Sequence, residues 1–165
     1  FPIGSGKTPE YSTVGSAIMD LVGKENDFPN HIPLAHKPIV AARYAYVKEG
    51  CKLNVDDLPP ELAVATRRDA KTGKVANYSH VFKRLDRNRP STTMVPGHNA
   101  FPIHPTLNRT LTAREAARIQ TFPDTHIFFG TRQQQCIQVG NAVPPKMAEP
   151  FMRKIATYLS EEVAK

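Results

Sequence analysis

Several residue types that shape a fold are rare in this sequence of 165 residues. There is no tryptophan, and the two cysteines, Cys51 and Cys136, stand far apart in the chain. Two isolated thiols exclude a disulfide framework and a four-cysteine zinc site, because both need more cysteines at short spacing. No run approaches the roughly 20 apolar residues that span a bilayer, and the first residues lack the charged-then-apolar order of a signal peptide. We therefore expect no membrane partner.

Motifs that carry catalytic chemistry by themselves are also missing. The six histidines are scattered singly. His98 and His104 have neither helical spacing nor a third ligand, so no metal site is predicted. Residues 4–8 match only the end of a phosphate-binding loop, whose first glycine would stand where Phe1 does. We interpret residues 4–8 as a solvated terminus and predict no catalytic residue in this chain.

Positive charge is present in excess. Lysine and arginine outnumber aspartate and glutamate by 22 to 15, which gives a net charge of +7. Most of this excess lies in residues 67–89, which hold eight basic and two acidic side chains. A charge run is often only a solvated surface. Here, however, hydroxyl side chains follow at Ser91, Thr92 and Thr93, and they suit contacts to phosphates and base edges. Double-stranded DNA is the predicted partner.

Fifteen prolines divide the chain into short elements. Apolar spacing, caps and stop residues predict helices at about residues 13–22, 38–48, 58–68, 112–121, 131–140 and 144–159. Between residues 70 and 105, turn residues alternate with short β-like runs at 79–85 and 92–95. The predicted fold class is therefore α+β, a small irregular β-rich domain flanked by helices.

The last predicted helix carries a stripe of apolar residues at steps of four, namely Met147, Phe151, Ile155 and Leu159. A stripe at the end of a chain needs a surface to cover it. That surface belongs either to another domain or to the core of this one.

Two motifs in the second half of the chain closely resemble motifs of DNA cytosine-5 methyltransferases. Residues 104–124, which include LTAREAARIQTFPD, are similar to the ninth sequence block of that family. Residues 138–145, QVGNAVPP, are similar to its tenth block. Upstream, residues 84–93 resemble a weaker signature of the family's target-recognition segment, here called the recognition signature. Residues 13–18 resemble the linker after the eighth block.

The resemblance implies the C-terminal part of such an enzyme, either a fragment or the small subunit of a split methyltransferase. Its glycine-rich cofactor block and its Pro-Cys nucleophile motif do not occur in this chain, since Cys51 follows Gly50 and Cys136 follows Gln135. Three parts are implied: a linker and short helix (1–37), a target-recognition domain that includes the ninth block (38–135), and the tenth block with a C-terminal helix that packs on the absent catalytic domain (136–165). The chain alone is expected to be inactive.

The implied activity of the whole enzyme is methyl transfer from S-adenosylmethionine to C5 of cytosine in a specific duplex sequence. This activity implies a bacterial restriction-modification system and a location in the cytoplasm or at the nucleoid. The alternatives are a DNA-binding or regulatory module without a methylation role, and a purely structural assembly subunit.

Residue roles follow from the same resemblance. Asn141, Ala142 and Val143 are implied to line part of the S-adenosylmethionine pocket. The implied DNA contacts are Arg84 and Thr93, with Arg87 and Arg89 as further contacts to the DNA backbone. For Arg84 the alternative is a structural pair with a neighbouring carboxylate. In the ninth block, Ala116, Ala117 and Ile119 are expected to pack in the core, and Arg114 and Arg118 to organise the recognition domain.

Overall fold

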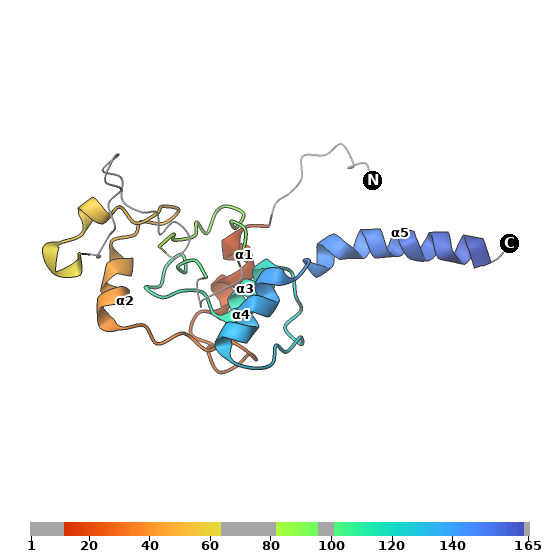
Figure 1. Ribbon diagram of the computed structural model, residues 1–165, viewed down its shortest axis with the longest axis horizontal. Helices are drawn as coiled ribbons and strands as arrows, with labels where there is room; N and C mark the ends of the chain where they lie inside the picture. Colours follow the sequence, from red (N-terminus) through yellow and green to blue (C-terminus); the bar gives the residue numbers. More distant parts are fainter. Residues whose placement is uncertain (1–11, 64–81, 96–100, 164–165) are drawn as a thin grey trace, which may run out of the picture.

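The computed structural model describes residues 12–63, 82–95 and 101–163. In these ranges the helices are α1 (Val14–Ile18), α2 (Pro38–Ala45), α3 (Ala113–Ile119), α4 (Arg132–Asn141) and α5 (Pro145–Val163), with 3-10 turns η1 (Met19–Leu21), η2 (Val55–Asp57) and η3 (Pro60–Leu62). Figure 1 shows α1, α3 and α4 together at the centre, α2 to one side, and α5 extending away on the other.

Threonine caps begin three of these helices and confirm the predicted starts. The Thr13 hydroxyl accepts from the amide of the third residue of its helix in α1. At α3, Thr112 and Glu115 form the predicted capping box, in which each side chain satisfies a backbone amide of the other. Thr131 and Gln134 form a second box at α4. The starts of most helices can therefore be predicted from the sequence, because a capping residue and its partner lie only three positions apart.

One predicted helix, at residues 58–68, is wrong in its described part. Only the short turn η3 forms there, after Pro59 and Pro60. Residues 64–68 lie outside the described ranges. Proline at the start of a helix is tolerated, but a single 3-10 turn gains too few hydrogen bonds to propagate without packing.

The main core lies among α1, α3 and α4. It consists of Val14, Ile18, Leu85, Met94, Phe101, Leu111, Ala116, Ala117, Phe128, Cys136 and Val139, with Ile119 half-buried against it. The predicted core positions of the ninth block are thus confirmed. Close packing also explains Gly15, whose N–H donates to the Arg87 carbonyl oxygen, because a Cβ at Gly15 would lie 2.7 Å from that oxygen.

The expected β-rich domain is wrong, because the described residues contain no β-strand. Four segments are joined by three isolated bridges, one between each pair of neighbours: Lys52 with Lys83, Arg84 with Ile103, and Ile103 with Thr110. The run at 92–95 forms no bridge within the described ranges. Pro102 and Pro105 flank the shared segment and have no N–H to extend a ladder. Pairing therefore stops after one residue.

Buried arginine side chains hold these irregular segments instead. Arg114 is fully buried and donates hydrogen bonds to the carbonyl oxygens of Pro29, Pro123 and His126. These bonds join the loop before α2 to the turn after α3. The predicted role of Arg114 as an organiser is confirmed, since buried carbonyls without a donor would be costly.

None of the helices in the described ranges is long and apolar enough to cross a membrane.

Candidate functional site

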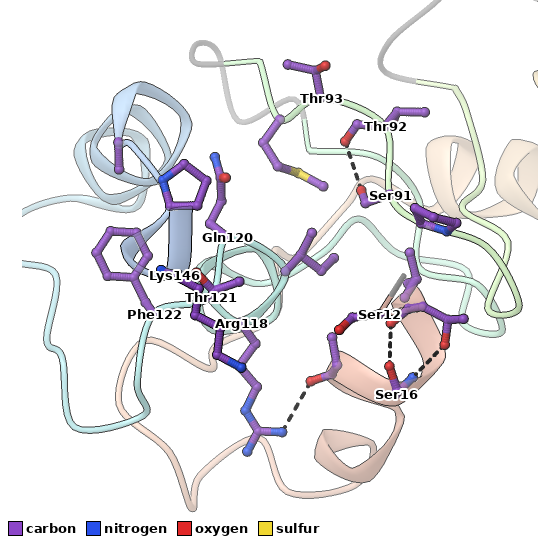
Figure 2. A pocket seen from close by; sticks show the side chains of 18 of the residues that line it. Ser12, Ser16, Ser91, Thr92, Thr93, Arg118, Gln120, Thr121, Phe122 and Lys146 are labelled. Carbon is purple, nitrogen blue, oxygen red and sulfur yellow. Dashed lines mark hydrogen bonds between the residues drawn. The ribbon is translucent and has the colours of Figure 1, made fainter. Parts of the chain in front are cut away.

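A groove of about 940 Å³ lies between the start of α1, residues 90–94 and the turn after α3. Figure 2 shows the side chains of Ser91, Thr92 and Thr93 on one side of it, across from Thr121 and Lys146. The Thr92 and Thr93 side chains are exposed. The groove therefore offers several hydroxyl groups to a polar ligand.

The groove brings together two segments that the sequence separates by almost fifty residues. Thr93 of the recognition signature and Ala142 of the tenth block both line it. Asn141, the last residue of α4, is exposed beside it, and Val143 is 63% exposed. The predicted DNA-contacting and cofactor-contacting segments thus meet at one place on the surface.

Arg84, in contrast, does not reach the groove and is only 5% exposed. All five of its N–H groups have acceptors at 2.7–2.8 Å, namely the carbonyl oxygens of Tyr44, Val47, His104 and Leu107 and the amide oxygen of Asn108. Burial lowers the pKa of Arg84 from its ordinary value. The expected DNA contact does not fit these bonds, because no N–H is left over. The carboxylate partner of the alternative does not fit either, since these acceptors are carbonyl and amide oxygens.

Arg87 and Arg89 lie on the surface at the start of α1. The Arg87 guanidinium donates to both carboxylate oxygens of Glu49 at 2.8–2.9 Å, and this hydrogen bonding lowers the pKa of Glu49 to about 2. The Arg89 side chain is 81% exposed, with its Nε 3.5 Å from a carboxylate oxygen of Asp86. Arg89 is therefore the freer of the two cations. Four more basic residues of this stretch, 67, 68, 71 and 74, lie outside the described ranges.

Arg118 forms part of the groove wall and is fully engaged in structural contacts. It donates to both oxygens of Asp124 at 2.6–2.8 Å and to Asp20 at 2.7 Å. Its guanidinium carbon also lies 5.1 Å from the centroid of the Phe28 ring. Arg118 therefore has a structural role in the groove wall. The other cation in the lining is Lys146, which is exposed and makes no ion pair with any described residue.

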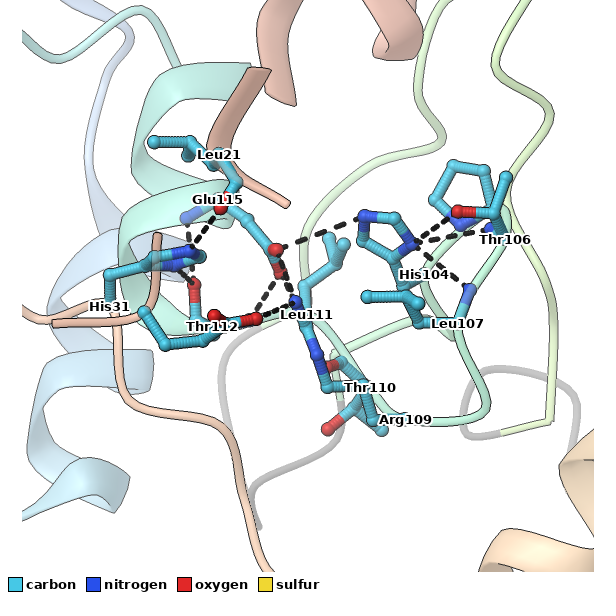
Figure 3. Close-up of polar contacts among 12 residues, drawn as sticks. Leu21, His31, His104, Thr106, Leu107, Arg109, Thr110, Leu111, Thr112 and Glu115 are labelled. Carbon is cyan, nitrogen blue, oxygen red and sulfur yellow. Dashed lines mark hydrogen bonds and ion pairs between the residues drawn. The ribbon is translucent and has the colours of Figure 1, made fainter. Parts of the chain in front are cut away.

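A buried polar cluster, which the sequence did not reveal, supports the ninth block (Figure 3). The Arg109 guanidinium donates to both oxygens of Glu115 at 2.7–2.8 Å, and the Thr112 amide donates to one of them. Burial alone would raise the pKa of Glu115, but these hydrogen bonds and the Arg109 charge lower it below its ordinary value. His31 bonds the Thr112 hydroxyl at 2.8 Å. No local pattern marks His31 as a partner of a helix 81 residues away.

His104 completes this cluster as a neutral side chain. Its Nδ1 accepts from the amides of Thr106 and Leu107 at 3.2 Å, which places the proton on Nε2. Burial lowers the pKa of His104 to about 4. Its Nε2 lies 3.8 Å from Glu115 Oε1, so this contact is not an ion pair at neutral pH.

The described ranges contain both cysteines, of which Cys51 is exposed and Cys136 is buried. The Cys136 thiol is buried, and burial raises its pKa, which disfavours the thiolate. The same ranges contain no group of three or more His, Cys, Asp or Glu residues that could hold a metal ion.

The family model described as C-5 cytosine-specific DNA methylase matches residues 3–157. This chain belongs to that family. Among curated methylases, the type II methyltransferase M.DdeI of Desulfomicrobium norvegicum is 32% identical over 185 residues, covering 90% of this chain and 44% of that protein. The type II methyltransferase M.AquIB of Picosynechococcus sp. is 34% identical over 146 residues, covering 81% of this chain and 91% of that protein.

A solved structure agrees with this family. It is a crystal structure described as a candidate DNA modification methyltransferase encoded within a prophage (E. coli). It has a TM-score of 0.52 and 30% identity, and the match covers 78% of this chain and 28% of that one. The chain therefore spans less than half of M.DdeI and of this structure, but most of M.AquIB.

Proposed function

We propose that this chain is the DNA-recognition portion of a DNA (cytosine-5)-methyltransferase of a type II restriction-modification system. It would act with a catalytic portion, on the same or another polypeptide, that carries the glycine-rich and Pro-Cys blocks. The observation that carries this proposal is the groove, because the recognition signature and the tenth block both line it. The type II relatives and the 44% coverage of M.DdeI support it.

The proposed DNA contacts are the exposed groups at and beside the groove. The Thr93 hydroxyl is the proposed direct contact, and the cations of Arg87, Arg89 and Lys146 attract the phosphate backbone. Of these cations Arg87 contributes least, because Glu49 already neutralises it. A cytosine stacked in a duplex hides the atoms that react, so the complete enzyme has to flip it out. This chain would hold the duplex while that happens.

Arg84 is assigned a positioning role in place of direct contact. Its hydrogen bonds to Tyr44, Val47 and His104 hold Arg84 in the interior next to the buried Leu85, at the start of the segment that carries Thr93. Because Arg84 is anchored in the interior, the position at which the exposed part of this segment begins is fixed.

The residues of the tenth block fit one edge of a cofactor site. The Asn141 carboxamide is exposed, can both donate and accept, and bonds to no described residue. Ala142 at the groove and the exposed Val143 add a small apolar edge. S-adenosylmethionine, when bound, supplies an electrophilic methyl group. Asn141 would orient that ligand, and the catalytic portion would supply the remaining walls.

Helix α5 is the proposed contact with the catalytic portion. Its large apolar side chains are exposed: Met147, Phe151, Met152, Ile155, Tyr158 and Leu159. All but Met152 recur at steps of three and four and so share one face. Burying apolar surface contributes about 25 cal/mol per Å² before association costs. One helix face of 19 residues is therefore worth several kcal/mol.

Labelled methyl transfer tests the proposal. The purified chain, a polypeptide with the glycine-rich and Pro-Cys blocks, and their mixture are each incubated with duplex DNA and labelled S-adenosylmethionine. Only the mixture should label cytosine. Labelling by this chain alone would contradict the proposal. DNA binding without methyl transfer in any mixture would favour the regulatory module instead.

A further inference from the structure

Thr121 has an unusual backbone conformation at the edge of the groove. It follows α3 with φ of +65°, in the left-handed region. Glycine enters this region without a steric penalty, whereas a β-branched residue there is an outlier. Such conformations persist only where surrounding contacts hold them.

The contacts of Thr121 join the end of α3 to the start of α5. Its N–H donates to the Arg118 carbonyl oxygen at 2.9 Å and so closes the last turn of α3. Its hydroxyl accepts from the Lys146 amide at 3.1 Å, in the first turn of α5. The first amides of a helix have no acceptor within it, so this hydroxyl acts as a cap. Figure 2 shows Thr121 and Lys146 next to each other.

Few other contacts hold α5 to the part of the fold formed by α1, α3 and α4, here called the body. Its large apolar side chains are exposed, and Figure 1 shows it extending away from the other helices. Within the described ranges, the polar contact between α5 and the body is the bond from Lys146 to Thr121. The angle at which α5 leaves the body is therefore set at its first turn, near Pro144 and Thr121.

We propose that Thr121 is a positioning residue, whose left-handed backbone aims its hydroxyl at α5 and so fixes the direction of that helix. The partner of α5 rests on the proposed function, in which the apolar face of α5 docks on the catalytic portion. The bond between Thr121 and Lys146 lies within this chain and does not depend on that function.

A distance measurement on the full chain tests this proposal. One spin label is attached to the exposed Cys51 and another to a T157C variant of α5, while Cys136 is buried and stays unlabelled. The distance distribution should be narrow with Thr121. It should stay narrow in Thr121→Ser, which keeps the hydroxyl. It should be at least about twice as wide in Thr121→Val and Thr121→Gly, which lose the cap.

Matched variants exclude general unfolding as the cause. Thr125→Val, on the same loop and exposed, should behave as the parent. Thr121→Gly should melt at or above the parent temperature, because glycine relieves the unfavourable backbone conformation. The proposal is overturned if Thr121→Val keeps the parent distribution, or if Thr121→Ser is as wide as Thr121→Val.

Association with the catalytic polypeptide gives a second measurement. Thr121→Val should weaken binding roughly 2- to 10-fold, the loss expected for one hydrogen bond, and Thr121→Ser should restore it. If the parent chain does not bind that polypeptide, the proposed function fails while the distance result still decides the role of Thr121. Equal binding by the parent and Thr121→Val would overturn the positioning role in assembly.

Discussion

Buried arginine side chains give this fold hydrogen bonds that strands provide elsewhere. Arg84 and Arg114 together satisfy carbonyl oxygens on several separate loops. From the sequence, Arg84 looks like its neighbours Arg87 and Arg89, because all three belong to one basic stretch. Which of them is buried depends on contacts with residues 20–40 positions away, in α2 and in the loop at His104. Charge pattern alone could not separate the structural arginine from the surface ones.

Replacing Arg84 should therefore destabilise the fold. Arg84→Gln leaves several buried carbonyl oxygens without a donor, each costing about 1–3 kcal/mol, so the free energy of unfolding should fall by more than about 3 kcal/mol. Urea unfolding followed by circular dichroism measures this change. The control Arg89→Gln, at an exposed position, should stay within about 0.5 kcal/mol of the parent. If Arg84→Gln is stable but loses DNA binding in the complete enzyme, the hypothesis that Arg84 contacts DNA directly would be supported instead.

His104 should make stability depend on pH. An unfolded histidine titrates near 6.5 and the folded one near 4, so at intermediate pH only the unfolded state binds the proton. Stability is full above pH 6.5 and falls as the pH decreases towards 4, by roughly 3 kcal/mol at about 1.4 kcal/mol per pKa unit. The pKa of His36 is also lowered by burial, so His36 contributes in the same direction.

His104→Asn isolates this contribution, because its amide oxygen can still accept from the two loop amides. Chemical unfolding at several pH values should show a shallower loss between pH 6.5 and 4 than in the parent. If the slope in His104→Asn equals that of the parent, another titratable group causes the dependence of stability on pH.

At the scale of elements, most helices are predictable from the sequence, whereas the helix at 58–68 and the β segments are not. The capping boxes at Thr112 and Thr131 are short-range signals, and the structure uses both. The β-like runs at 79–85 and 92–95 carry no information on their partners. Whether a run becomes a strand depends on its pairing with distant residues. Here Pro102 and Pro105 limit the pairing of Ile103 with Arg84 and Thr110 to single bridges, and the run at 92–95 forms no bridge within the described ranges.

The apolar face of α5 should matter for assembly and not for folding. Phe151→Asp places a charge in the middle of that face, where Phe151 is 42% exposed in this chain. The melting temperature of the isolated chain should change little. Binding to the catalytic polypeptide, measured by calorimetry, should be lost. Ser160→Asp on the opposite face is the control and should bind as the parent. An unfolded Phe151→Asp chain would mean that the face belongs to its own core.

At the scale of the whole molecule, residues from distant parts of the sequence converge on one groove. The resemblance predicted the separate roles of Thr93 and Ala142, but not that the two residues share a surface feature. Their proximity depends on the packing of α1, α3 and α4, which no local signal encodes. The net charge of +7 likewise predicts that the chain binds DNA, but it does not show which surface the DNA contacts.

DNA binding by the isolated chain should be weak and should fall steeply with salt, because phosphate contacts release counterions. Arg89→Gln should weaken binding to all duplexes about equally and reduce the salt slope by about 1. Fluorescence anisotropy at several salt concentrations measures both quantities. An unchanged slope would place the DNA contacts away from Arg89.

The central claim is that this chain carries the sequence recognition of its methyltransferase. The most direct measurement supplies the catalytic polypeptide with this chain, with its Thr93→Val variant or with its Thr125→Val variant, and maps the methylated cytosines in random duplex DNA by bisulfite sequencing. If the claim holds, Thr93→Val lowers methylation or changes the sequence around the methylated cytosine, whereas Thr125→Val behaves as the parent. The same methylation level and the same sequence context with all three chains would place recognition in the catalytic polypeptide and contradict the claim.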